Sequence, residues 1–193
     1  MRTQDVRVDY ISISRNLNCF EHVFSHDELS LLRRSWSDDF DVLYELGLAF
    51  FSYIFQAAPG STSLFPGLMD NGKQQWSETG KFRCVSVKVV QSIAYMIKNV
   101  QNNRAATDDH LRELGRGHAR MAEQTFQPNY WVLAKEAVVN LMEVRLNEGK
   151  CLPHVQPDEN EAALKAWNRI AIYMVEMMQD GFEAERSSLR SKK

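Results

Sequence analysis

Apolar residues recur with the period of an α-helix along most of the chain. Two such stripes occupy residues 29–36 and 43–55. Ser25 and Glu28 have the spacing of a capping box, in which both side chains accept hydrogen bonds from free amides of the first helical turn. Proline has no amide proton and disfavours helix in the residue before it. The pattern therefore predicts one helix that begins after Ser25 and a second that ends before Pro59.

Apolar spacing predicts four more helices downstream. They cover about residues 81–101, a short segment capped by Thr107, a segment that Pro128 opens and that ends near Gly149, and a last segment that starts with a near capping box at Asp158 and Glu161 and stops at Gly181. Residues 60–80 are rich in Gly, Ser, Asn and Gln, and predict a corner with short helical turns at most. No alternating β-branched segment and no repeat of 20–50 residues competes with this pattern. The sequence predicts an all-α protein.

A glycine within the second predicted helix bears on how the helices pack. Gly47 has no β-carbon and lets another helix approach closely. Together with the varied lengths of the connections, it favours six to eight helices that cross obliquely over a parallel bundle. Periodicity alone selects the all-α class and no particular fold within it.

The composition is that of an ordinary soluble globular protein. Hydrophobic residues make up 44% of the 193 positions, charged residues make up 25%, and the formal net charge is −2. This length predicts one domain with extensions. We place the domain at 25–182, an N-terminal extension at 1–24, and a polar C-terminal tail at 183–193 that we expect to fray. No basic stripe alternates with aromatic residues, so no nucleic-acid partner is expected.

The location of the protein is predicted from segments that the sequence lacks. No apolar run approaches the roughly 20 residues of a membrane-spanning helix, and the N-terminus has no apolar secretory core. Cys19, Cys84 and Cys151 are odd in number and far apart, which indicates reduced thiols rather than a disulfide framework. We expect a cytoplasmic protein with no transmembrane segment, in which Cys84 is a buried packing residue.

His118 has the most distinctive setting of the five histidines. It shares a predicted helical face with Leu114 and Leu111, which lie one and two turns earlier. This setting suits either a core histidine with a satisfied ring or a metal ligand on an apolar face. We expect His110 to be solvated near a helix start. The histidines that lack the setting of His118 are His22, His26, His110 and His154.

An ordered set of residues resembles the globin family over about residues 25–182. It contains a helix B glycine, a bulky distal-pocket residue, an aromatic one turn on, the proline that opens helix C and the phenylalanine of the CD corner, which are Gly47, Phe51, Phe55, Pro59 and Phe65. Leu114 and His118 look like the helix F leucine and the proximal histidine. Trp36 resembles the helix A tryptophan, and Trp167 stands where helix H often carries an aromatic residue. The segments LGRGH and FQPNY resemble those of invertebrate globins.

The resemblance implies a haem-binding protein with the globin fold. His118 would be the proximal ligand of the haem iron. The haem would be haem b (iron protoporphyrin IX), because the sequence has no CxxCH motif for covalent attachment. The other ring nitrogen of His118 should donate to a backbone carbonyl or a hydroxyl of the same helix, which fixes the ring's orientation. Phe65 would stack on the haem and Phe51 would line the distal pocket, with Leu114 beside the ligand.

The distal side departs from the family pattern. The position of the usual distal histidine falls on Val85, with Val89 one turn further and Lys88 just before it. No histidine occurs between residues 27 and 109, so no shift of register restores a distal imidazole from this helix. We therefore expect five-coordinate ferrous iron in an apolar pocket. Lys88 would be a surface cation that can reach a haem propionate, and Lys88 and Gln91 are the nearest polar groups that can swing inward.

Three classes of function remain open for such a protein. The first is reversible binding of O₂, CO or NO at ferrous haem iron, for storage, transport or sensing. The second is a redox role, either electron transfer or consumption of nitric oxide or peroxide, so enzymatic activity is undecided. The third is a haem-free interaction domain, which His118 and Phe65 argue against. A homodimer is also left open.

Overall fold

The computed structural model describes residues 24–65, 80–121, 126–151 and 153–192. Their α-helices and 3-10 helices (η) follow in the order α1 (His26–Ser35), α2 (Phe40–Ala57), η1 (Pro59–Leu64), α3 (Gly80–Asn99), α4 (Arg104–Met121), α5 (Asn129–Asn147), η4 (Pro157–Glu159) and α6 (Asn160–Ser191). No strand occurs in this described part of the chain. The predicted all-α class is confirmed.

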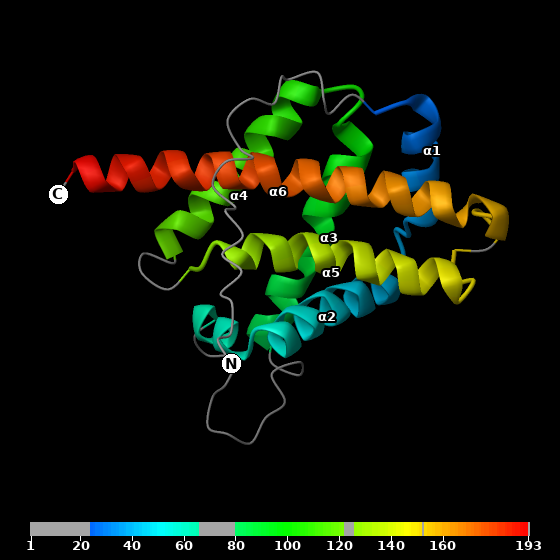
Figure 1. Cartoon of the computed structure of the whole chain (residues 1–193), viewed down its shortest axis with the longest axis horizontal. Coiled ribbons are helices and arrows are strands. Elements are labelled where there is room, and N and C mark those ends of the chain that lie inside the picture. The colour runs from blue at the N-terminus through cyan, green and yellow to red at the C-terminus, as the bar shows by residue number, and fades with distance from the viewer. Residues whose placement is uncertain (1–23, 66–79, 122–125, 152, 193) are drawn as a thin grey trace, which may run out of the picture.

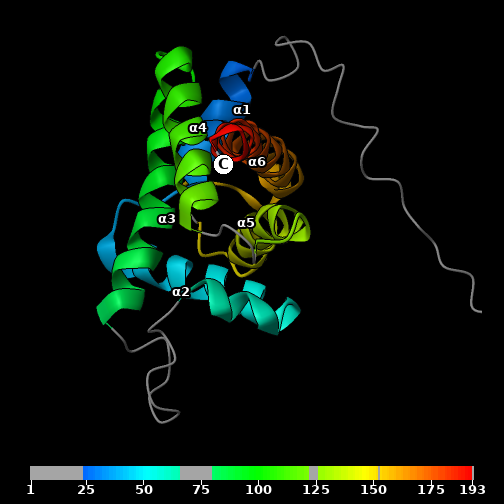
Figure 2. The ribbon, with the colours of Figure 1, turned by 90° about the vertical axis from the view of Figure 1, so that its left-hand side faces the viewer.

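The helices cross at oblique angles, as the varied connections predict. Figure 1 shows α5 and α6 lying side by side and antiparallel, with α2 below them and α3 crossing behind at a steep angle. The view turned by 90° places α3 and α4 together on one side of the molecule, with α6 and α5 beside them and α2 beneath (Figure 2). This arrangement brings α4 against α6 although the two helices are far apart in the sequence.

Polar contacts cap the first helix, and polar and aromatic contacts join its end to the last helix. The predicted capping box is confirmed, since the Glu28 amide donates to Ser25 Oγ at 3.1 Å and the Ser25 amide donates to Glu28 Oε2 at 2.8 Å. Trp167 of α6 is fully buried, and its indole Nε1 donates to Ser35 Oγ at 2.8 Å. The Trp36 ring lies against it with the ring centroids 5.6 Å apart. These contacts satisfy a buried indole donor while two large aromatic side chains pack together.

The helix crossing expected at Gly47 is present. A β-carbon built on Gly47 would lie 2.8 Å from the Ser86 β-carbon and 2.9 Å from the Ser86 carbonyl oxygen. Gly47 and Ser86 are both buried, so α2 and α3 touch backbone to backbone at this point. The crossing fixes which residues of α3 lie near α2.

The start of α4 differs from the expectation that Thr107 caps a short helix. The helix has 18 residues and begins at Arg104, so Thr107 lies inside it. Thr107 is buried, and its hydroxyl donates to the Asn103 carbonyl at 2.9 Å. Asn103 Oδ1 accepts from the Ala106 amide at 3.4 Å, and asparagine is as good a capping residue as threonine. The strong helix formers Arg104, Ala105 and Ala106 then extend the helix backwards.

The limits of α6 also differ from the prediction at both ends. The capping box consists of Gln156 and Glu159 rather than Asp158 and Glu161, and α6 begins at Asn160. The helix has 32 residues and continues through Gly181 to Ser191. The predicted helix stop at Gly181 is therefore wrong, and so is the prediction that the tail frays, for the residues described. Gly181 is buried inside the helix, where the missing side chain serves packing against α4 rather than termination.

The crossing of α2 and α3 leads to a first prediction. Gly47→Ala should destabilise the protein by about 1–3 kcal/mol, because the added methyl group forces the backbones of α2 and α3 apart. The free energy of unfolding in urea measures the effect. Gly60→Ala is the matched control, since nothing lies within 4 Å of its added methyl group. Equal stability of the two variants would contradict a close crossing at Gly47.

Candidate functional site

His118 lies near the C-terminal end of α4 and makes the hydrogen bond expected of it. Its Nδ1 lies 2.7 Å from the Leu114 carbonyl oxygen, one helical turn earlier. A carbonyl only accepts, so Nδ1 carries the proton and donates. In this tautomer the lone pair of the neutral ring is on Nε2. The side chain thus offers one nitrogen for coordination and uses the other to hold its orientation, as the sequence predicts.

The surroundings of His118 favour the neutral ring. Burial lowers the pKa of His118 below its ordinary value of 6.5, and the hydrogen bond to Leu114, which favours the protonated ring, offsets only part of that effect. A neutral imidazole is the form that binds a metal ion. The charge state and the tautomer of His118 therefore both suit a metal ligand.

Aromatic rings to which the sequence gives no role in the site pack beside His118. The centroid of its ring lies 5.7 Å from that of Trp131 and 6.3 Å from that of Phe126. Phe182 of α6 packs on both of these rings, at 4.9 Å from Phe126 and 5.7 Å from Trp131. The available signal in the sequence is the segment FQPNYW, which leads into α5 and has three aromatic residues within six positions.

A second aromatic cluster is centred on Phe51 of α2, which is 3% exposed. Its ring centroid lies 5.3 Å from those of Phe65 and Phe82 and 5.7 Å from that of Phe55. Phe65, just after η1, is half-buried and keeps part of its surface uncovered. Phe51 and Phe65, which were expected to line the distal pocket and the haem face, thus meet in one apolar cluster.

The remaining predicted site residues lie on α3 and α4. Val85, Val89 and Leu114 are half-buried and pack against the core, whereas Lys88 is exposed. Apolar side chains that are only partly covered provide the kind of dry surface that a flat apolar cofactor buries. The chemistry of these apolar side chains and of the neutral His118 imidazole suits a haem group.

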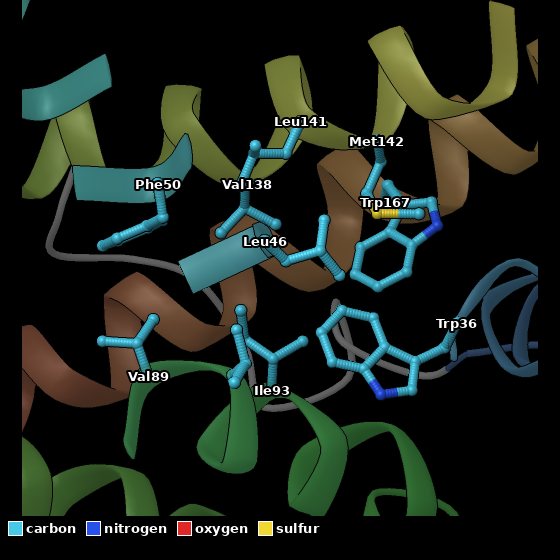
Figure 3. Close-up of a pocket in the computed structure, with 10 residues that line it drawn as sticks. Trp36, Leu46, Phe50, Val89, Ile93, Val138, Leu141, Met142 and Trp167 are labelled. Atoms are coloured by element: carbon cyan, nitrogen blue, oxygen red, sulfur yellow. The ribbon is translucent and has the colours of Figure 1, made fainter. Parts of the chain in front are cut away.

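A small cavity lies behind Val89, between α2, α3, α5 and α6. Its volume is about 10 Å³ and its lining is apolar, and Trp36 and Trp167 close one end of it (Figure 3). A space of this size holds one water-sized sphere at most, and an apolar lining keeps it dry. Val89 is therefore shared between the predicted distal side and the cavity.

The structure does not bring all the predicted residues into one set of contacts. Within the described residues, no ring contact or hydrogen bond joins His118 to Phe51 or Phe65; its ring partners are Phe126 and Trp131. His118 thus belongs to the aromatic group on the α4–α5–α6 side, and Phe51 and Phe65 belong to the group on the α2–α3 side, although both groups pack into the same hydrophobic core.

Two expectations about other residues are wrong. His110 is half-buried rather than solvated, because α4 begins at Arg104 and His110 therefore lies inside the helix rather than at its start. The centroid of its ring lies 4.5 Å from that of Tyr95. Its Nε2 atom is buried and has no hydrogen-bond partner among the described residues. Cys84 is exposed rather than a packing residue, since it lies on the outer face of α3. His26 and His154 are exposed, and His22 lies outside the described residues.

The neutral state of the half-buried His118 ring leads to a prediction about pH. The pKa of the folded state lies below that of the unfolded chain, so the unfolded chain takes up the proton first as the pH falls below about 6.5. The apoprotein should lose stability through this range, and His118→Gln should lose less stability between about pH 7.5 and pH 5. Urea unfolding at both pH values gives the difference. The exposed His154→Gln variant should behave like the original chain, and an unchanged slope in His118→Gln would refute the argument.

Comparisons with known proteins identify the family and the fold. The Globin family model matches residues 48–174. Among solved structures, the chain is similar to the crystal structure at pH 4 of a hexacoordinated haem protein from an anhydrobiotic tardigrade, with a TM-score of 0.66 and 18% sequence identity, covering 83% of this chain and 96% of that one. No curated protein matches the chain significantly. No helix in the described residues is both long and apolar enough to cross a membrane. Because the family model spans well over half of the sequence, the chain belongs to the globin family.

Proposed function

We propose that this globin binds one haem group through His118. The observation that carries the proposal is the hydrogen bond from His118 Nδ1 to the Leu114 carbonyl, which leaves a neutral ring with a free lone pair on Nε2. The haem protein among the similar structures is in keeping with it. A bound haem would supply an iron centre that takes a diatomic gas. The absence of CxxCH favours non-covalent haem b.

The chain's own residues would hold the group by burying its apolar faces. Phe65 and Phe51 would cover it on one side, and Leu114 would cover it beside His118. Val85 and Val89 would line the distal side. Because the Lys88 side chain is exposed, its ammonium group would remain at the edge, where it can pair with a propionate. The domain that does this would extend over about residues 25–182.

The function that we propose is reversible binding of O₂ or another diatomic gas, such as CO or NO, for storage, transport or sensing. The residues proposed for the distal side present apolar groups, namely Phe51, Val85 and Val89. Such a pocket admits a small uncharged gas and discriminates by steric access and polarity. A gas is the partner that this chemistry fits.

The lack of a histidine on the distal side favours a second candidate function in redox chemistry. No histidine occurs between residues 27 and 109, so this segment supplies no imidazole that could donate a hydrogen bond to a bound gas. A hydrogen bond to a charged or strongly polarised group contributes about 1.5–3 kcal/mol, which corresponds to roughly ten- to a hundred-fold in retention. Oxygen should therefore leave or oxidise the iron readily, as in a globin that transfers electrons or consumes nitric oxide or peroxide. The autoxidation rate and the reduction potential separate the two functions.

The role of His118 is tested by removing the imidazole. His118→Ala should lose most bound haem, because the variant removes the proposed iron ligand, and the Soret absorbance after gel filtration measures what remains. Added free imidazole should restore binding if the loss is one of coordination. His154→Ala, at an exposed site, is the control. Full haem content and an unchanged Soret band in His118→Ala would show that the iron is ligated elsewhere.

The coordination of the distal side is tested by the visible spectrum of the ferrous protein without added ligand. We expect a five-coordinate spectrum, in contrast to a hexacoordinated haem protein such as the tardigrade neighbour. A sharp, split α/β pair would indicate six-coordinate low-spin iron and contradict the prediction. Lys88→Ala then identifies the ligand, because a pair that this variant removes must come from the Lys88 amine.

A further inference from the structure

We propose that the close crossing of α4 and α6, at Gly115 and Gly181, together with the Phe182 ring beside it, sets the position of His118. The inference rests on the proposed role of His118 as the haem ligand. Gly115, Gly181 and Phe182 are positioning residues in this account, since they act on the ligand through the helices and rings around it.

The crossing leaves no room for a side chain on either helix. A β-carbon built on Gly115 would lie 1.8 Å from the Met178 carbonyl oxygen, and one built on Gly181 would lie 2.0 Å from the Arg112 carbonyl oxygen. Real β-carbons essentially never come within 3.0 Å of such atoms. Any side chain at either position must move one backbone away from the other by about an ångström.

The two helices run in the same direction, and their side chains pair in one register. Tyr173 Oη donates to Asp108 Oδ1 at 2.6 Å, at the start of the contact. Farther on, Arg120 Nε donates to Glu185 Oε1 at 3.0 Å. Both pairs are 65 residues apart in the sequence, on either side of the glycine crossing. The polar pairs resist sliding of α4 along α6, while the glycines set the separation of the helices.

The part of α6 after Gly181 also reaches His118 through its aromatic neighbours. Phe182 is 7% exposed and packs on Phe126 and Trp131, with centroids 4.9 and 5.7 Å away. Both of these rings contact the His118 ring. The backbone of α4 and the ring of its histidine are therefore both held by α6.

The link to the ligand follows from the spacing on α4. His118 lies three residues after Gly115, and its hydrogen-bond acceptor Leu114 lies directly before Gly115. A displacement of α4 at Gly115 therefore moves the imidazole and its acceptor together. A metal ligand must be held to within about half an ångström for its intended geometry. The crossing of α4 and α6 thus fixes the position of the proposed iron ligand, His118.

The first test compares three alanine variants of the haem-loaded protein. Gly115→Ala and Gly181→Ala should shift the iron–histidine stretching band in the resonance Raman spectrum of the ferrous form. Both should also release haem to a scavenging apoglobin about tenfold faster or more, the size of effect that supporting residues of metal ligands have. Gly117→Ala is the control on the same helix, since nothing lies within 4 Å of its added methyl group, and it should match the original chain.

The second test avoids the backbone clash, so it decides the matter if the glycine variants do not fold. Phe182→Leu removes the ring that packs on Phe126 and Trp131, and should shift the same band and speed haem release. Phe40→Leu makes the same change at a 66% exposed phenylalanine of α2 and should change neither. Folded Gly115→Ala, Gly181→Ala or Phe182→Leu proteins with the original band and release rate, even if less stable, would overturn the inference.

Failure of the proposed function gives a different result. If His118→Ala keeps its full haem content and iron–histidine band, His118 is not the ligand, whatever the glycine variants do. If His118→Ala loses haem and the variants at Gly115, Gly181 and Phe182 leave the band unchanged, the ligand is right and the support by α6 is wrong.

Discussion

The backbones of α4 and α6 approach each other so closely that neither has space for a β-carbon at Gly115 or Gly181. An α-helix that packs through ordinary side chains keeps its axis about 8–10 Å from its neighbour. Glycine removes the layer of side chains between the helices, and the two backbones meet directly. The path of α4, and with it the position of His118, therefore depends on α6 continuing as a helix beyond Gly181.

Polar groups buried near this contact are satisfied by one another. Tyr173 is fully buried, its hydroxyl donates to Asp108, and the Arg104 guanidinium lies 4.3 Å from the centre of its ring. Burial and the hydrogen bond to Asp108 raise the pKa of Tyr173 well above its ordinary value. The phenol therefore stays protonated and keeps its role as a donor. Leaving such a group without its partner would cost about 1–3 kcal/mol, more than a typical exposed ion pair contributes.

The two sides of the candidate site are built on different physical principles. On the side of His118, a hydrogen bond to Leu114 orients the ring, and Phe126 and Trp131 pack on it. The side formed by Phe51 and its aromatic neighbours is held by apolar packing, in which ring contacts join Phe51 to Phe65 and Phe82. Directional bonding suits a group that must point at one atom, whereas an apolar wall suits a pocket that admits small uncharged molecules.

Local features of the sequence determined much of the fold. The box of Ser25 and Glu28, the helix stop before Pro59 and the opening of α5 after Pro128 are found where they are predicted. The close approach at Gly47 is confirmed, as is the hydrogen bond that orients His118. These features depend on residues within a few positions of one another or on the absence of a side chain. A single sequence displays both directly.

Only the tertiary structure decided how far α4 and α6 extend and what surrounds their histidines. Gly181 has the sequence character of a helix stop, and it lies inside a helix because the backbone of α4 occupies the space of its missing side chain. The His110 ring packs on Tyr95, and Phe182 packs on the rings beside His118. Each of these contacts joins residues from different elements of the fold. Propensity and periodicity act within a few turns of one helix, so they carry no information about which distant segment fills the space beside it.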